Sequence, residues 1–151
     1  MRILIIDDNP YDAELVRLEL RNFGKIDFDY VQDHASFKKL YNKGKYTAIL
    51  SDYNIPGVST VDLLKEVRAE DKLVPYIFVS GTVGEELAVE LLKLGATDYV
   101  LKTNLNKLPI ALSRAIKEME VTLAEKFALK QMMASERRLV RANQLARMGN
   151  W

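Results

Sequence analysis

Five polar side chains stand where short apolar runs of this sequence end. They are Asp7, Asp8, Asp52, Ser80 and Lys102. If the apolar runs are parallel strands, their carboxyl ends meet at one edge of an open sheet, where such sheets bind ligands. The pattern therefore predicts that three carboxylates, one hydroxyl and one ammonium group share a single site.

Three carboxylates in one site need positive charge. Two of them about 4 Å apart repel by about 4 kcal/mol at an effective dielectric constant near 20. Lys102 supplies one positive charge, and a divalent cation would supply the rest. Ligands that are all oxygen favour Mg²⁺ or Mn²⁺, and Mg²⁺ is usually completed by waters and a phosphate oxygen. The residues thus predict a Mg²⁺ site that awaits a phosphoryl group.

This arrangement indicates phosphoryl transfer to an aspartate. A carboxylate can act as a nucleophile and form an acyl phosphate, and the transfer needs mainly alignment and charge neutralisation. Asp52 is the preferred nucleophile because it is a single acid on the predicted central strand, opposite the pair Asp7-Asp8. The Ser80 hydroxyl could donate to a phosphoryl oxygen, and Lys102 could neutralise one. An isolated aspartate after a strand is usually a helix cap or turn residue, so the hypothesis rests on the coincidence of all five.

The elements that must position these residues alternate along the first hundred residues. Short apolar runs that read as strands are separated by helical patterns of about ten residues, which indicates parallel strands with right-handed crossovers. We therefore predict an α/β fold, a flavodoxin-like doubly wound five-stranded parallel sheet of order 2-1-3-4-5. The expected strands are 2–6, 26–31, 46–51, 76–80 and 98–101, and the expected helices include 34–43.

Composition excludes several other classes of protein. The chain has 151 residues, 48% of them apolar, with a net charge of +1, no cysteine and one histidine, His34. These counts exclude disulfides, thiolate chemistry and sites built from several histidines. Balanced charge gives no reason to expect nucleic acid as a partner. No apolar run approaches the roughly 20 residues of a membrane span, and the N-terminus lacks a signal-peptide pattern. We expect a cytoplasmic protein.

The last forty residues differ in character. Between Pro109 and Gly149 there is no glycine or proline, which predicts one helix of up to about 40 residues and about 60 Å. Its apolar residues first keep a 4-3-4 spacing, at Leu112, Ile116, Met119 and Leu123. We expect the second half to project from the domain as a coiled coil or linker that dimerises. A solvated tail is the plainer alternative.

The segments around the five polar residues resemble the response-regulator receiver domain of two-component systems. They are Ile3 to Asn9, Ser51 to Gly57, Val79 to Gly81 and Gly95 to Lys102. The resemblance covers residues 1–120. A helical linker would follow at 121–148. Residues 149–151 would begin a PAS-like domain, because Ser135 to Trp151 resembles the segment that leads into such domains. The chain would then be part of a longer protein that ends in a histidine kinase or a cyclic-dinucleotide enzyme.

The resemblance implies a role for each residue of the site. Asp52 would accept the phosphoryl group from the phosphohistidine of a sensor histidine kinase or phosphotransfer protein. Asp8 and Asp52 would bind Mg²⁺ with the Asn54 carbonyl, while Asp7 would act mainly through water. Lys102 would pair with the acyl phosphate.

The resemblance also implies a switch. Ser80 would move to the phosphate and Tyr99 would change rotamer. Asn54 and Thr82 would tune the lifetime of the phosphate. The face formed by the fourth helix, fifth strand and fifth helix would then change its partners, homodimerisation included. Such a module is not an enzyme beyond its own phosphorylation and dephosphorylation.

One residue departs from the family pattern. The family usually has proline after the lysine, often with a cis bond, but this chain has Thr103. A cis bond without proline costs about 2.5–4 kcal/mol. Either the Lys102–Thr103 bond is trans and the loop differs, or the fold supports a strained bond.

Three other functions are alternatives to a phosphoacceptor module. A haloacid-dehalogenase-like phosphatase also uses a nucleophilic aspartate but needs an acid two residues later, where this chain has Asn54. A flavodoxin-like electron carrier needs a phosphate loop after the first strand, where Asp7 and Asp8 would repel a flavin phosphate. A scaffold that dimerises through the helix without phosphate would have no use for the acid cluster.

Overall fold

The computed structural model describes residues 1–81 and 84–148 of the chain. The chain divides into two compact units, Met1–Lys117 and Glu118–Trp151, and each is described by itself.

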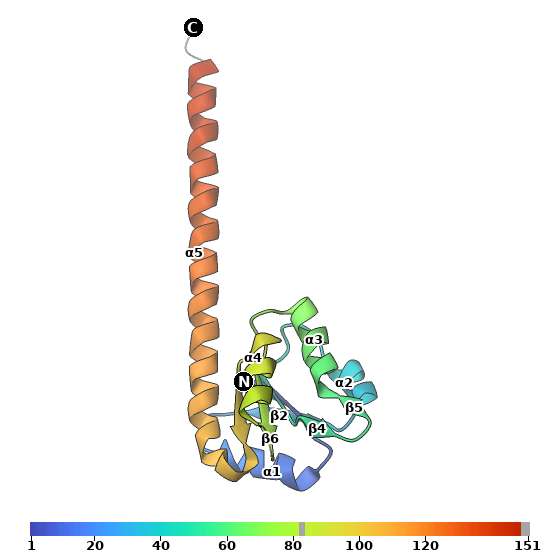
Figure 1. Cartoon of the computed structure of the whole chain (residues 1–151). Helices are drawn as coiled ribbons and strands as arrows, with labels where there is room; N and C mark the ends of the chain where they lie inside the picture. The colour runs from blue at the N-terminus through green and yellow to red at the C-terminus, as the bar shows by residue number, and fades with distance from the viewer. Residues whose placement is uncertain (82–83, 149–151) are drawn as a thin grey trace. The chain divides into compact units, whose positions relative to one another are not determined.

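The first unit is built on a five-stranded parallel sheet with strand order β2-β1-β3-β6-β7 (Figure 1). Ranked along the chain, these strands have the predicted order 2-1-3-4-5, with β2 at one edge. The strands are β1 (Arg2–Ile6), β2 (Asp27–Val31), β3 (Ala48–Ser51), β6 (Tyr76–Ser80) and β7 (Asp98–Leu101). The predicted fold class is confirmed.

Alternate strand residues enter two separate cores, one on each face of the sheet. Leu4 and Ile6 of β1 belong to the core that α3 covers, whereas Ile3 and Ile5 belong to the core that α1 and the start of α5 cover. Because both faces are buried, the central strands β1, β3 and β6 are mostly apolar, as is usual in parallel sheets, with serine only at the ends of β3 and β6. The helices are α1 (Pro10–Glu19), α2 (His34–Leu40), α3 (Thr60–Glu70), α4 (Glu85–Lys93) and α5 (Leu108–Met148).

Side-chain caps fix where the first three helices begin. Asn9 accepts a hydrogen bond from the Tyr11 backbone N–H, and Pro10 follows at the first helical position, as expected. Asp33 and Ser59 cap α2 and α3 in the same way. These caps place the start of each helix directly after the preceding strand or turn.

Helix α2 is shorter than predicted. The glycine pattern indicated a helix over 34–43, but α2 ends at Leu40, and Tyr41 has the extended backbone angles φ −72° and ψ 129°. The Tyr41 ring stacks between Phe37 and Tyr46, with centroid distances of 5.1 and 6.2 Å. This aromatic stack, which joins residues on different elements, outweighs the local preference for three more helical residues.

A two-stranded hairpin follows the central strand. It consists of β4 (Asn54–Ile55) and β5 (Val58–Ser59), which pair antiparallel. Pro56 and Gly57 form the turn, and Gly57 has φ +76°, a value that glycine adopts without strain. Sequence reasoning had predicted only a turn here. The hairpin holds the backbone of Asn54, which lies two residues after Asp52 in the sequence.

The segment after β7 has a form that sequence reasoning did not predict. No cis peptide bond occurs in the described residues, so the Lys102–Thr103 bond is trans. A short 3-10 helix, η1 (Lys102–Lys107), follows at once, and Asn104 within it departs from helical angles. Of the two alternatives left open for this bond, the structure shows the trans bond with a different loop.

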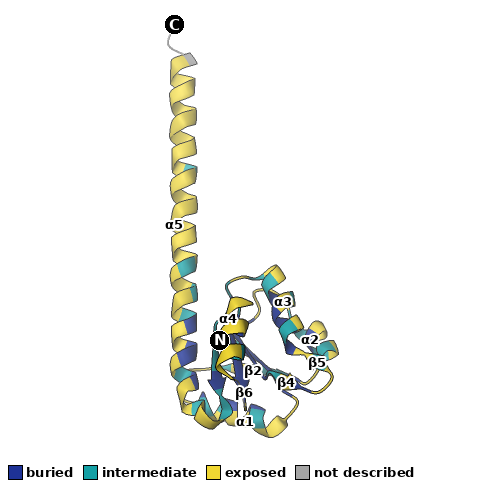
Figure 2. Ribbon diagram, in the orientation of Figure 1, coloured by how far each residue is buried: buried dark blue, intermediate teal, exposed yellow. Residues whose placement is uncertain are grey.

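Helix α5 is a single helix of 41 residues, close to its predicted length. Leu108, Ala111, Leu112 and Ala115 are buried in the core beside α1. In the second unit the side chains up to Arg147 are almost all exposed, including Leu129, Met132 and Leu139, as Figure 2 shows in yellow. Within residues 1–81 and 84–148, no helix has both the length and the apolar character that a membrane crossing needs.

Candidate functional site

The acids that follow β1 and β3 form one cluster at the carboxyl edge of the sheet. Ile6 pairs with Ser51 in the parallel register, so the next residues, Asp7 and Asp52, leave the sheet at the same level. Asp7, Asp8 and Asp52 each offer a carboxylate oxygen within 4.8 Å of the others. We call these three residues the acid pocket. Asp7 and Asp52 are buried, with 3% and 7% exposure, whereas Asp8 is exposed.

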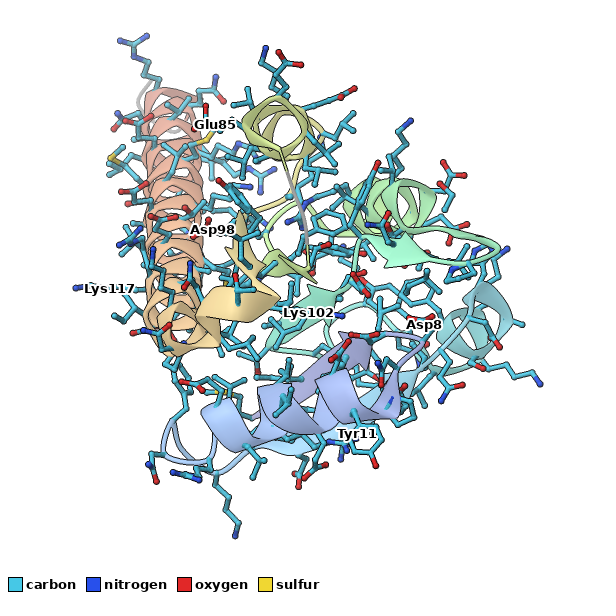
Figure 3. The ribbon with its side chains drawn as sticks, turned by 60° about the horizontal axis from the view of Figure 1, so that its bottom comes forward. Asp8, Tyr11, Glu85, Asp98, Lys102 and Lys117 are labelled. Atoms are coloured by element: carbon cyan, nitrogen blue, oxygen red, sulfur yellow. The ribbon has the colours of Figure 1, made fainter. Side chains whose placement is uncertain are left out.

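Lys102 reaches the acid pocket from the end of β7. Its Nζ lies 3.0 Å from Asp7 Oδ2 and 3.0 Å from Asp52 Oδ2. A third carboxylate, Asp12 of α1, is closer still, at 2.8 Å. In Figure 3, which turns the bottom of the molecule toward the viewer, Lys102 and Asp8 both lie above α1. The sequence predicted that Lys102 lies near Asp7 and Asp52, but it did not predict the contact with Asp12.

Burial and neighbouring charges shift the pKa of Asp7 and of Lys102. Burial raises the pKa of Asp7 to about 6, although the Asn9 backbone N–H and Lys102 act to lower it. Burial alone would lower the pKa of Lys102, but its hydrogen bonds to Asp12, Asp52 and Asp7 outweigh burial and raise it. Lys102 is therefore firmly charged at neutral pH, whereas Asp7 takes up a proton just below neutrality.

The acid pocket fits a divalent cation. Its donors are all carboxylate oxygens, which suit a hard cation such as Mg²⁺. Three acids and the single ammonium of Lys102 leave two negative charges uncompensated. A second positive ion would compensate them.

Two backbone amides hold the carboxylates of the pocket in place. Asn9 donates its N–H to Asp7 Oδ1 at 3.0 Å, and Asn54 donates its N–H to Asp52 Oδ1 at 3.3 Å. The Asn54 side chain is exposed. Asn54, whose carbonyl is predicted to bind the metal, therefore contacts the pocket through its backbone N–H.

Ser80 ends β6 with an unsatisfied hydroxyl. Its Oγ is buried and has no hydrogen-bond partner within the described part of the chain. A buried hydroxyl without a partner costs about 1–3 kcal/mol. Ser80 lies beside Leu101 in the parallel register, one residue before Lys102. A ligand oxygen that reached this edge of the sheet would find a donor without a competing partner.

Tyr99 stands on β7 in register with Phe78 of β6. Its side chain is partly buried and packs against the core that α3 covers. It is thus beside the strand that carries Ser80 and on the strand that leads to Lys102. Thr82 and the start of the predicted PAS-like domain, 149–151, lie outside the described residues.

Comparisons with known proteins agree on one family. The family described as "Response regulator receiver domain" matches residues 3–113. The "Chemotaxis protein CheY-3" of Vibrio cholerae is 29% identical over 104 residues, which is 68% of this chain and 80% of that protein. The "Cell cycle response regulator CtrA" of Brucella ovis is 33% identical over 104 residues, 68% of this chain and 44% of that protein.

Two solved structures have a fold similar to that of this chain. The receiver domain of the Francisella response regulator 1452 matches with a TM-score of 0.67 and 26% identity, covering 78% of this chain and 97% of that one. A sensor protein from Polaromonas sp. JS666 matches with a TM-score of 0.68 and 29% identity, with the same coverage.

Proposed function

We propose that Asp52 accepts a phosphoryl group from a histidine kinase or phosphotransfer protein, because this chain belongs to the response regulator receiver domain family. The observation that carries the proposal is the Lys102 ammonium, which lies 3.0 Å from both Asp7 and Asp52 at the mouth of a pocket suited to a divalent cation. Proteins of this family are generally phosphoacceptors rather than enzymes that turn over a substrate.

In the proposed step, an Asp52 carboxylate oxygen attacks phosphorus in line with the leaving group. A new O–P bond forms, the N–P bond to the donor imidazole breaks, and that nitrogen keeps the electron pair. The step needs alignment more than covalent assistance.

The other residues of the site bind and neutralise the transferred group. Asp7, Asp8, Asp52 and the Asn54 carbonyl would hold Mg²⁺, which neutralises charge on the phosphoryl oxygens. Lys102, which pairs with Asp52, would supply a second positive charge. The Ser80 hydroxyl, which lacks a partner among the described residues, can donate to a third oxygen.

The switch would follow from that last contact. A phosphate oxygen satisfies Ser80, and Tyr99 on the neighbouring strand then changes rotamer. Both changes bias a two-state equilibrium of the face formed by α4, β7 and the start of α5. Val89 and Leu92 of α4 and Ile110 of α5 are exposed apolar side chains on these elements, and they support a protein partner.

We also propose that the chain forms a homodimer in the cytoplasm, through this face or through a coiled coil of the C-terminal helix. Support for the helix comes from its exposed apolar side chains, among them Phe127, Met132 and Leu139. The proposal includes a PAS-like domain after the helix, and neither a nucleic acid nor a membrane as a direct partner.

The test is phosphorylation by a small donor. We expect the intact mass to rise by one phosphoryl group with acetyl phosphate and Mg²⁺, and not to rise when a chelator removes the metal. Asp52→Asn should abolish the rise. Asp62→Asn, which removes an exposed acid from the first turn of α3, is the matched control and should behave like the wild type. Equal modification of Asp52→Asn and the wild type would refute the proposal.

A further inference from the structure

Asp12 is the carboxylate nearest to the Lys102 ammonium. Its Oδ2 lies 2.8 Å from Lys102 Nζ, closer than the oxygens of Asp7 and Asp52. It is not a member of the acid pocket, and neither the phosphoryl transfer nor the metal site described above uses it. The two side chains are partly shielded, with 27% exposure for Asp12 and 18% for Lys102.

The start of α1 is tied to the acid pocket by consecutive contacts. The Asn9 backbone N–H donates to Asp7 Oδ1, while the Asn9 side chain accepts from the Tyr11 backbone N–H and caps the helix. Asp12 is the acid of the first turn that this cap fixes. Its position relative to Asp7 is therefore set by two hydrogen bonds rather than by a mobile loop.

The hydrogen bonds of the ammonium group show what Asp12 contributes. Lysine has three N–H donors, and here three carboxylates lie within reach of them. Phosphorylation would turn the Asp52 carboxylate into an acyl phosphate, whose negative charge lies on the phosphoryl oxygens, and Asp7 would be shared with the cation. Asp12 is the one partner of Lys102 that keeps its full charge for the ammonium before and after transfer.

Lys102 stands at the junction of β7 and η1, which places its backbone but leaves the end of its long side chain to be held by other contacts. Ordering a lysine side chain costs rotamer entropy. The ion pair with Asp12 of the neighbouring helix α1 restrains the ammonium group.

We propose that Asp12 is a positioning residue that holds the Lys102 ammonium beside Asp52, where the oxygens of the phosphoryl group arrive. This inference rests on the proposed function. Asp12 anchors the ammonium rather than competing for it, because one N–H can stay on Asp12 while those released by Asp52 and Asp7 turn to the phosphoryl oxygens. Loss of Asp12 should therefore weaken phosphoryl binding instead of strengthening it.

The experiment compares Asp12→Ala and Asp12→Asn with the wild type at saturating Mg²⁺. Two quantities are measured: the rate constant of phosphorylation by acetyl phosphate, and the apparent affinity for beryllofluoride, a phosphoryl mimic. Loss of a partly shielded ion pair predicts a three- to tenfold decrease in both, about 0.7–1.4 kcal/mol. Glu14→Ala is the control, because Glu14 is on the same helix but pairs with Arg17 at the surface, and it should match the wild type.

A second comparison separates positioning from a merely structural role. In a Lys102→Met background the Asp12 substitutions should cause no further decrease, because the group that Asp12 positions is gone. Lys102→Gln, which also removes the positive charge, serves if Lys102→Met does not fold, and melting temperatures check that all variants are folded. An equal decrease in both backgrounds, a gain of affinity, or wild-type values for Asp12→Ala would overturn the inference alone. A wild type that neither is modified nor binds beryllofluoride would overturn the proposed function and this inference with it.

Discussion

Replacing Asp7 with asparagine should stabilise the metal-free protein at pH 7. Burial raises the pKa of this carboxyl from 3.8 to about 6 in the folded protein. The folded state therefore binds more protons than the unfolded state between these values, and stability falls as pH rises through that window. The penalty is absent well below pH 4 and fully present above pH 6. Asparagine has nearly the same shape and carries no charge at any pH.

The pKa shift sets the size of the effect. About two pKa units correspond to about 3 kcal/mol at most. Asparagine keeps a hydrogen-bond acceptor for Lys102 but loses the ionic part of that contact, so we expect a gain of about 1–3 kcal/mol. For a chain of this length that is a rise in Tm of about 3–9 °C.

Thermal unfolding followed by circular dichroism, with a chelator present, would measure this gain at pH 4, 5.5 and 7. The difference between Asp7→Asn and the wild type should grow with pH, while Asp62→Asn should show no such trend. Added Mg²⁺ should stabilise the wild type more than Asp7→Asn, because the variant offers the cation one carboxylate fewer. An asparagine variant that is less stable at pH 7, or a gain that is the same at every pH, would refute the reasoning.

Three further outcomes follow from other parts of the molecule. Ser80→Ala should stabilise the metal-free protein by about 1–3 kcal/mol in urea unfolding, because it removes a buried hydroxyl that has no partner in the described residues, yet weaken beryllofluoride binding; a destabilised variant would contradict this. Gly95→Ala should cost about 1–3 kcal/mol in urea unfolding, since Gly95 has φ +117° and a Cβ there would meet Arg68 Cγ at 3.0 Å; unchanged stability would contradict it. Leu139→Lys should shift the chain toward monomer in analytical ultracentrifugation if α5 pairs with a second copy, and a monomeric wild type at high concentration would exclude that pairing.

The sheet was predictable because its signals are local and repeated. Each central strand is an apolar run that ends at a polar residue, and the helices between them leave only right-handed parallel crossovers. The same regularity brought Asp7, Asp52, Ser80 and Lys102 to one edge, because a residue that follows a strand is placed by the sheet itself. The long helix was equally clear from the absence of glycine and proline between Pro109 and Gly149.

Features that depend on contacts between distant residues were not predictable. Asp12 contacts Lys102 across 90 positions of the chain, from a helix whose start is fixed by the Asn9 cap. An acid in the first turn of a helix is commonplace at that position, since it favours the helix dipole, and so gave no signal. The early end of α2 depends in the same way on an aromatic stack that reaches Tyr46.

The most direct test of the central claim is to locate the phosphoryl group. The chain would be treated with acetyl phosphate and Mg²⁺, reduced with borohydride, which converts an aspartyl phosphate to homoserine, and mapped by peptide mass spectrometry. We predict homoserine at position 52 and at neither of the other two acids that pair with Lys102, Asp7 and Asp12, nor at Asp8. Homoserine at Asp7, Asp8 or Asp12, or an unmodified chain after treatment with Mg²⁺ present, would contradict the account.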